Sequence, residues 1–371
     1  MKIVITGVNL VEGGPLKVFK DVIRAFVESG DIDIICLVHK KSLFFDLDSP
    51  RLQFFEYPEI KSSWLKRIRF EYFSSLALSR KIKPDIWLSM HDMSSRVDVP
   101  LQFVYCHNPS PFYKSTTKEL RYDFKLFLFS FFYRWLYKLN IKSNRAVIVQ
   151  QQWIGEFLVN NLRAKNYIVS RPITSSHNNE IVKSQFEGKS KLKFFYPALA
   201  RTFKNFELIL DAVNYLKQYH PIVYKKLEVN LTIDGQTNRY ASSLVDKYEE
   251  LNVVNFLGVL TYEDVVKNYK SCDVVLFPSK LETWGLPITE AKEFSKPIIL
   301  ADLPYAYETL GNYSSALFVN PDDYISLANI MIKIVDGSDV FQNATYEDDG
   351  SVVGSWDKLI DKIKNIYFCE K

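Results

Sequence analysis

The 371-residue chain lacks the features that define metal proteins, disulfide-rich proteins and membrane-spanning proteins. Its four cysteines are scattered without the spacing of metal ligands, so we expect reduced, buried thiols. No apolar stretch is free enough of charged residues to cross a bilayer. No charged-then-apolar leader precedes the strand-like residues 2–6, which indicates a cytoplasmic protein. A net charge of +4 gives no indication of nucleic acid as a partner.

What the chain does contain is a series of short apolar strands that alternate with helical segments, in two successive halves. This alternation predicts parallel sheets flanked by helices, and the length suits two α/β domains. We expect a first domain at residues 1–168, a polar linker at 169–190, a second domain at 191–353 and a terminal helix at 354–371. The predicted strands span residues 2–6, 33–39, 52–57, 84–88, 100–106 and 146–151, then 193–196, 229–233, 253–257, 274–277, 297–300 and 316–321.

Residues 273–291 combine a buried strand, a loop and the start of a helix. The helix begins at residues 285–287, where Pro287 suits the first turn because a missing N–H costs nothing there. The free amides of that turn and the positive end of the helix dipole favour a phosphate group. Glu282 in the loop and Glu290 in the first helical turn can accept hydrogen bonds from sugar hydroxyls. The pattern indicates a nucleoside-diphosphate sugar as ligand; alternatively, Glu290 only caps the helix and Glu282 is a solvated loop acid.

The pair Glu282 and Glu290 resembles the Glu-x7-Glu signature of retaining GT-B glycosyltransferases of the family 4 type, and the resemblance extends over most of the chain. It implies a GT-B fold, in which two Rossmann-like domains face a central cleft and the terminal helix crosses back to the first domain. It also implies that Glu282 lies near the donor sugar, that Glu290 binds the ribose, and that no metal or other cofactor is required. Further donor-binding residues implied by the resemblance are Gly285, Leu286 and Pro287 and, beside the nucleotide base, Val259 and Leu260.

Residues 201–205 form a second candidate element, a loop that leads into a helix. Arg201 and Lys204 are two cations three residues apart, which suits a diphosphate leaving group whose negative charge grows as the glycosidic bond breaks. Alternatively, they are solvated loop cations. With Asn205 they resemble the Arg-x-x-Lys-Asn form of the phosphate-binding loop in the same family, although Ala200 stands where many members have glycine.

The first half carries candidate glycines and a candidate histidine directly after predicted strands. Gly13 and Gly14 follow the first strand and would let the backbone approach a diphosphate sugar; alternatively, they form a plain tight turn. His107 follows the strand at 100–106 and matches a histidine that faces the donor sugar in the family. A histidine can hydrogen-bond a sugar hydroxyl in either protonation state. His91 also follows a strand and is the weaker candidate; the alternative for His107 is a role in the turn before Pro109.

Two segments of the first half, residues 63–80 and 121–142, interleave aromatic and basic side chains. This composition is typical of a helix that lies in a membrane interface, with its apolar side down and its cations near anionic headgroups. The alternative is a helix buried in the first domain. The residues expected to contact the membrane are Trp64, Phe131, Phe132 and Trp135.

The resemblance implies a metal-independent, retaining hexosyltransferase, with Glu282, His107, Arg201 and Lys204 as its catalytic residues. It would move a sugar from a nucleoside diphosphate to a saccharide acceptor, lipid-linked at the inner face of the cytoplasmic membrane, as in O-antigen or capsule synthesis. Two alternatives remain open. A sugar-nucleotide epimerase of similar fold needs no acceptor, and a non-catalytic membrane-attached binder of nucleotide sugars would show no transfer.

Overall fold

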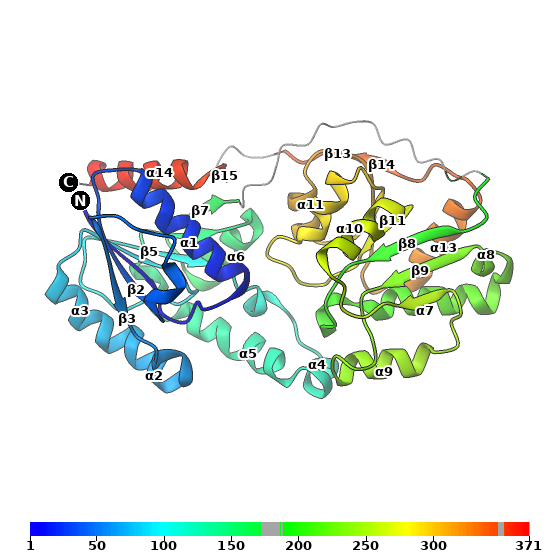
Figure 1. Ribbon diagram of the computed structural model, residues 1–371, viewed down its shortest axis with the longest axis horizontal. Helices are drawn as coiled ribbons and strands as arrows, with labels where there is room; N and C mark the ends of the chain where they lie inside the picture. The colour runs from blue at the N-terminus through cyan, green and yellow to red at the C-terminus, as the bar shows by residue number, and fades with distance from the viewer. Residues whose placement is uncertain (172–185, 187, 348–351, 371) are drawn as a thin grey trace. The chain divides into compact units, whose positions relative to one another are not determined.

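The computed structural model describes residues 1–171, 186, 188–347 and 352–370. The chain divides into two compact units (Figure 1). The first unit comprises Met1–Pro111, Phe131–Ile173 and Asp348–Lys371, and the second comprises Phe112–Ser130 and Thr174–Glu347. Across the described ranges, no helix combines the length and the apolar character needed to cross a membrane.

The first unit is built on a sheet of eight strands among its described residues, and every neighbouring pair is parallel. The central strands are buried along almost their whole length, as expected for strands covered on both faces. The order across the sheet is β15 (Val352–Val353), β7 (Tyr167–Ser170), β6 (Ala146–Val149), β5 (Leu101–Cys106), β4 (Ile86–Ser89), β1 (Lys2–Gly7), β2 (Asp33–Val38) and β3 (Leu52–Glu56).

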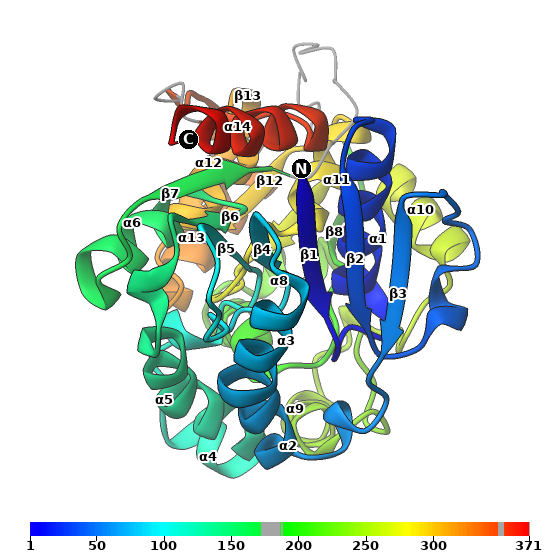
Figure 2. The same cartoon turned by 90° about the vertical axis from the view of Figure 1, so that its left-hand side faces the viewer.

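Helices pack on this sheet through apolar faces. Helices α1 (Gly13–Glu28) and α14 (Trp356–Cys369) contact each other, and they lie side by side in both views (Figures 1 and 2). Their buried residues join one core with the strands, and Tyr367 Oη donates a hydrogen bond of 2.6 Å to Asp85. The remaining helices of this unit are α2 (Trp64–Arg69), α3 (Ser75–Ile82), α6 (Gln152–Leu162) and the second half of α5 (Phe124–Lys138).

The second unit holds a sheet of seven strands within the described part of the chain. All neighbouring pairs are parallel except the last, in which β14 runs antiparallel to β13. The order is β10 (Val254–Phe256), β9 (Leu227–Leu231), β8 (Leu192–Tyr196), β11 (Val274–Phe277), β12 (Ile298–Ala301), β13 (Tyr313–Val319) and β14 (Gln342–Ala344). Because β8 and β11 are neighbours, the loops that follow them emerge side by side.

Helices of the second unit follow the predicted alternation with its strands. The longest, α7 (Phe206–Tyr219), packs against α13 (Tyr324–Val335) through buried aliphatic residues. The others are α4 (Thr117–Tyr122), α8 (Pro221–Lys225), α9 (Arg239–Tyr248), α10 (Tyr262–Ser271), α11 (Leu286–Glu293) and α12 (Pro304–Leu310).

The structure confirms the α/β class and all twelve predicted strands, with bounds shifted by a few residues, and it differs in a few places. Strands β7, β14 and β15 were not expected, since each is only a few residues long. Helix α1 begins at Gly13, so the glycines belong to the helix rather than to a turn before it. Residues 112–130, expected in the first domain, cluster with the second unit. Most of the predicted linker at 169–190 lies outside the described residues. Of the four free cysteines, Cys369 is exposed rather than buried.

Candidate functional site

The turn from β11 into α11 starts a helix where the sequence predicts one. Gly285 precedes the helix with a φ of +84°, a left-handed conformation that favours glycine. A Cβ there would lie 3.1 Å from the ring of Phe277 and 3.2 Å from Ile288, so a side chain does not fit without a shift. Pro287 lies in the first helical turn, as predicted. Leu286 is 60% exposed at the start of the helix, which leaves this end of α11 open to solvent.

Glu282 and Lys204 meet in this second unit as an ion pair. Lys204 comes from the loop after β8 and Glu282 from the loop after β11, and both side chains are largely buried. The ammonium of Lys204 also lies 5.5 Å from the ring centres of Phe203 and Phe277. Two groups that the sequence assigned to neighbouring parts of one ligand site are therefore in direct contact, and Glu282 is not a solvated loop acid.

Glu290 has a partner of its own. It lies in the second turn of α11, not the first, and it makes no cap to the helix start. Its Oε2 accepts a hydrogen bond of 2.7 Å from the hydroxyl of Tyr269, whose ring stacks on Phe294. Burial and the neighbouring Glu293 raise the pKa of Glu290, while the tyrosine hydrogen bond acts against that rise. The structure thus contradicts the alternative of a capping glutamate.

Asn205 fixes the loop that carries the two candidate cations. It has a left-handed backbone at the start of α7, and its buried amide donates to the carbonyl oxygens of Pro278 and Pro321 at 3.2 and 2.8 Å. The hydroxyl of Tyr196 donates to the carbonyl of Lys204 at 2.7 Å. Asn205 thus joins the loops that follow β8, β11 and β13. Its amide is already engaged by backbone carbonyls, so its role in this structure is to hold the loop.

Arg201 differs from Lys204 in its surroundings. Its side chain is 59% exposed and lies 3.5 Å from the carboxylate of Asp123, which belongs to the segment before α5. Val259 and Leu260 follow β10, at the same carboxyl edge of the sheet, after Gly258 with a φ of +69°. Val259 is exposed and Leu260 half-buried. The second unit therefore gathers most of the predicted donor-binding residues at one edge of its sheet.

The first unit holds the remaining predicted residues at the carboxyl ends of its strands. Gly13 has a φ of +68°, and a Cβ on Gly14 would meet nothing within 4 Å. The backbone N–H of His107 donates to Asp92 Oδ1 at 2.7 Å, and its Nε2 lies 3.5 Å from the other carboxylate oxygen. The Nδ1 atom of His107 is buried and makes no hydrogen bond within the described residues. His107 is thus held by Asp92, and its Nδ1 is closed to solvent.

Behind His107 lies a buried polar cluster that the sequence did not indicate. Glu71 is fully buried, 3.1 Å from Nε2 of His91, and its other oxygen accepts from Ser95 at 2.6 Å. Arg67 donates to the carbonyl of His91 at 2.8 Å. Burial raises the pKa of Glu71 to about 7 and lowers that of His91 well below its usual value. Glu71 sits in a π-helical turn, Phe70–Ser74, between α2 and α3, and such turns are frequent at functional sites.

The two aromatic and basic segments form α2, α3 and α5, and they are only half buried. On α5, the side chains of Tyr133, Leu136 and Tyr137 face the core. We define the aromatic patch as the predicted membrane residues Trp64, Phe131, Phe132 and Trp135, which are 40, 74, 54 and 62% exposed. Trp64 contacts Tyr133 edge to ring at 5.6 Å, and α2 and α5 lie side by side (Figures 1 and 2). A wholly buried helix is therefore contradicted.

The sequence contains two Asp-x-Asp triplets, a pattern that can hold a metal ion, at residues 31–33 and 46–48. Asp31 pairs with Arg51, and Asp46 pairs with Lys20 and Arg24. No cluster of three metal-binding side chains occurs in the part of the chain that the structure describes.

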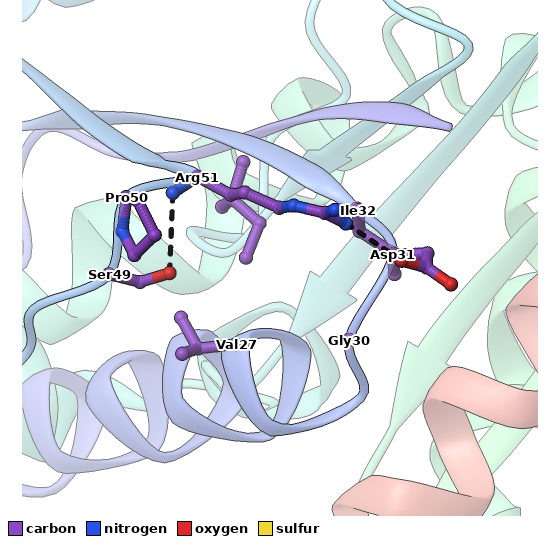
Figure 3. Close-up of a pocket in the computed structure, with 8 residues that line it drawn as sticks. Val27, Gly30, Asp31, Ile32, Ser49, Pro50 and Arg51 are labelled. Carbon is purple, nitrogen blue, oxygen red and sulfur yellow. Dashed lines mark hydrogen bonds and ion pairs between the residues drawn. The ribbon is translucent and has the colours of Figure 1, made fainter.

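A cavity of about 320 Å³ lies beside the Asp31–Arg51 ion pair (Figure 3). It is bordered by the end of α1 and by the amino ends of β2 and β3. Ligands of open parallel sheets bind at the opposite, carboxyl edge. The position of this cavity therefore gives it no part in the candidate site.

The two parallel α/β sheets with their flanking helices define the GT-B fold. Residues 176–347, nearly all of the second unit, match the model of the family described as Glycosyl transferases group 1. The chain therefore carries a glycosyltransferase group 1 domain.

Individual proteins resemble the chain in sequence and in fold. The O-antigen chain mannosyltransferase RfbU of Salmonella typhimurium is 26% identical over 69% of this chain and 69% of its own length. The lipopolysaccharide outer core galactosyltransferase WaaB superposes with a TM-score of 0.65 at 14% identity, covering 99% of this chain and all of that one. Alr3699/HepE of Anabaena, solved with UDP-glucose, gives 0.54 at 16% identity, covering 100% and 98%.

Proposed function

We propose that the protein transfers a hexosyl group from a nucleoside-diphosphate sugar to a hydroxyl of a saccharide acceptor, with retention of the anomeric configuration. The observation that carries this proposal is the contact between Lys204 and Glu282 at the carboxyl ends of two neighbouring strands, inside the family-matched region. A cation and a carboxylate held together there suit a ligand that carries phosphate and hydroxyl groups in succession.

Each residue of the site has a role in this reaction. Lys204 and Arg201 stabilise the negative charge that develops on the diphosphate as the bond to the anomeric carbon breaks, and the first amides of α11 add a partial positive charge. Glu282 accepts hydrogen bonds from the transferred sugar and Glu290 from the ribose. His107 orients the transferred sugar by a hydrogen bond to one of its hydroxyls. We assign no protein nucleophile, and we infer that these cations make a metal unnecessary.

Product analysis tests the reaction. The purified protein is incubated with saccharide acceptors and a panel of nucleoside-diphosphate hexoses. Mannose is tested first because the similar Salmonella protein is a mannosyltransferase. Transfer with the donor's anomeric configuration in the product, detected by NMR, is the expected result. Epimerised donor without transfer, or bound donor that is never consumed, would replace this proposal by one of the two alternatives.

We also propose that the acceptor is lipid-linked, as in the assembly of bacterial surface polysaccharides, and that the protein works at the inner face of the cytoplasmic membrane. The aromatic patch supports this, because exposed rings on α2 and α5 are accompanied by exposed cations that would attract anionic headgroups. Lys66, Arg69, Arg134 and Lys138 are among these exposed cations.

Vesicle binding tests the membrane proposal. The wild-type protein should sediment with anionic vesicles at low salt, and less with neutral ones. Replacing Phe131, Phe132 and Trp135 by serine should abolish this binding while the circular dichroism spectrum is kept. Two exposed apolar residues outside the patch, Ile222 and Phe368, serve as serine-substituted controls. Equal binding by patch and control variants would contradict the proposal.

A further inference from the structure

Residues Phe112–Ser130 form a segment that leaves the first unit after Pro111 and packs on the second. We call it the α4 segment. Its helix is firmly started, because Thr116 and Glu119 form a reciprocal capping box and Glu119 also accepts from Tyr113 at 3.0 Å. Glu119 is fully buried. The segment is therefore an ordered element that presents defined side chains to the second unit.

Lys118 attaches the α4 segment to the candidate phosphate loop. Its ammonium donates to the carbonyl of Thr202 at 2.8 Å and to Glu207 at 3.1 Å. The same ammonium lies 5.5 Å from the ring centre of Tyr240, whose hydroxyl donates to the other carboxylate oxygen of Glu207 at 2.6 Å. Thr202 stands between Arg201 and Lys204 in the chain. Lys118 thus holds the backbone of the loop that carries both cations, without extending to the ion pair of Lys204.

Asp123 acts on the same loop with the opposite charge. Its Oδ2 lies 3.5 Å from the guanidinium of Arg201, and its Oδ1 accepts the backbone N–H of Leu126 at 3.1 Å. Asp123 is mostly buried, whereas Arg201 is mostly exposed. The carboxylate is therefore fixed by the start of α5 while its partner is free to move. An ion pair at 3.5 Å with one exposed partner is weak, and Arg201 can exchange it for a stronger one.

We propose that the α4 segment sets the affinity of the loop for the diphosphate of the donor, a proposal that rests on the function proposed above. Asp123 is an internal competitor, because its carboxylate occupies Arg201 until a diphosphate displaces it. Lys118 is a positioning residue, because it holds the loop in the shape that binds. The two residues lie five positions apart and act in opposite directions: Asp123 weakens donor binding and Lys118 strengthens it.

Affinity measurements test both signs. The dissociation constant of the nucleoside diphosphate that binds the wild-type protein is measured by calorimetry at low and high salt. Asp123→Asn should tighten binding by about three-fold at low salt, the size expected from one weak ion pair, and less at high salt. Lys118→Met should weaken binding by about ten-fold, because it leaves a loop carbonyl and Glu207 without their partner, and Lys118→Arg should restore part of it.

Control variants distinguish a failure of this proposal from a failure of the proposed function. Lys217→Met and Glu250→Gln remove an ion pair elsewhere in the second unit and should leave affinity unchanged. A merely structural role for Asp123 would lower the melting temperature and never tighten binding, so unchanged or weaker binding by Asp123→Asn overturns the proposal. If the wild type binds the diphosphate and Lys204→Ala does not, the function proposed above stands. A failure of Asp123→Asn to tighten binding then overturns only the proposal for the α4 segment. If no nucleoside diphosphate binds the wild type, both proposals fall.

Discussion

The carboxyl edges of the two sheets differ in how their polar groups are assembled. In the second unit, the candidate groups come from short loops directly after neighbouring strands, and each charged side chain has one partner. In the first unit, His107 stands in front of a cluster built from a helix, a π-helical turn and the ends of several strands. The arrangement in the second unit suits exchange of a partner for a ligand. The arrangement in the first unit suits a fixed cluster that holds the side chain of His107 in place.

The largest expected effect comes from breaking the second unit's ion pair. Lys204→Ala should lower the turnover of donor by about 100-fold or more, since it removes a cation that stabilises the departing diphosphate. Initial rates of diphosphate release with acceptor present measure this. The melting temperature should fall as well, because the variant leaves the largely buried carboxylate of Glu282 without its partner. Turnover within two-fold of the wild type would remove Lys204 from the site.

The buried cluster of Glu71 and His91 in the first unit should instead affect the free energy of unfolding and its dependence on pH. The folded state keeps Glu71 protonated up to about pH 7, whereas the unfolded chain releases this proton near its usual pKa of 4.5. Unfolding therefore releases a proton between these pH values, and the contribution of Glu71 to stability is lost as the pH rises through that window. His91, whose pKa is lowered, acts oppositely, because its contribution is lost as the pH falls below 6.5.

Glu71→Gln isolates the first of these two contributions. Relative to the wild type, the variant should gain about 3 kcal/mol of unfolding free energy between pH 5 and pH 8. Denaturant unfolding at both pH values measures this, and Glu28→Gln on the exposed face of α1 is the control. A difference between variant and wild type that does not change with pH would show that Glu71 is ionised in the folded protein.

A smaller effect should follow from the backbone of the α11 turn. Gly285→Ala places a side chain at a φ of +84° and against Phe277, and should destabilise the second unit by about 1 to 2 kcal/mol. Donor affinity should fall as well, because the helix start that faces the phosphates shifts. Gly235→Ala is the matched control, since its Cβ would meet Val245 at an ordinary 3.9 Å. Equal unfolding free energies for the two variants would contradict this account of the turn.

The comparison of the two units also explains what the sequence could predict. The strands, the Gly285 turn, and the loops of Lys204 and Glu282 were predicted because each depends on a few consecutive residues. The Glu71–His91 cluster was not, since its members lie 20 residues apart and nothing in an aromatic and basic helix marks a glutamate as buried. The placement of the α4 segment on the second unit was missed for the same reason, because it depends on contacts of Lys118 with residues more than 80 positions away.

The central claim is that the second unit binds a nucleoside diphosphate through its two loops, and thermal stabilisation tests it most directly. A ligand that binds only the folded state raises the melting temperature. We predict that diphosphates of one base raise the melting temperature of the wild type and of Lys217→Ala, and that Lys204→Ala and Glu290→Ala lose most of that rise. No rise with any nucleoside diphosphate, or an equal rise in all four proteins, would contradict the account.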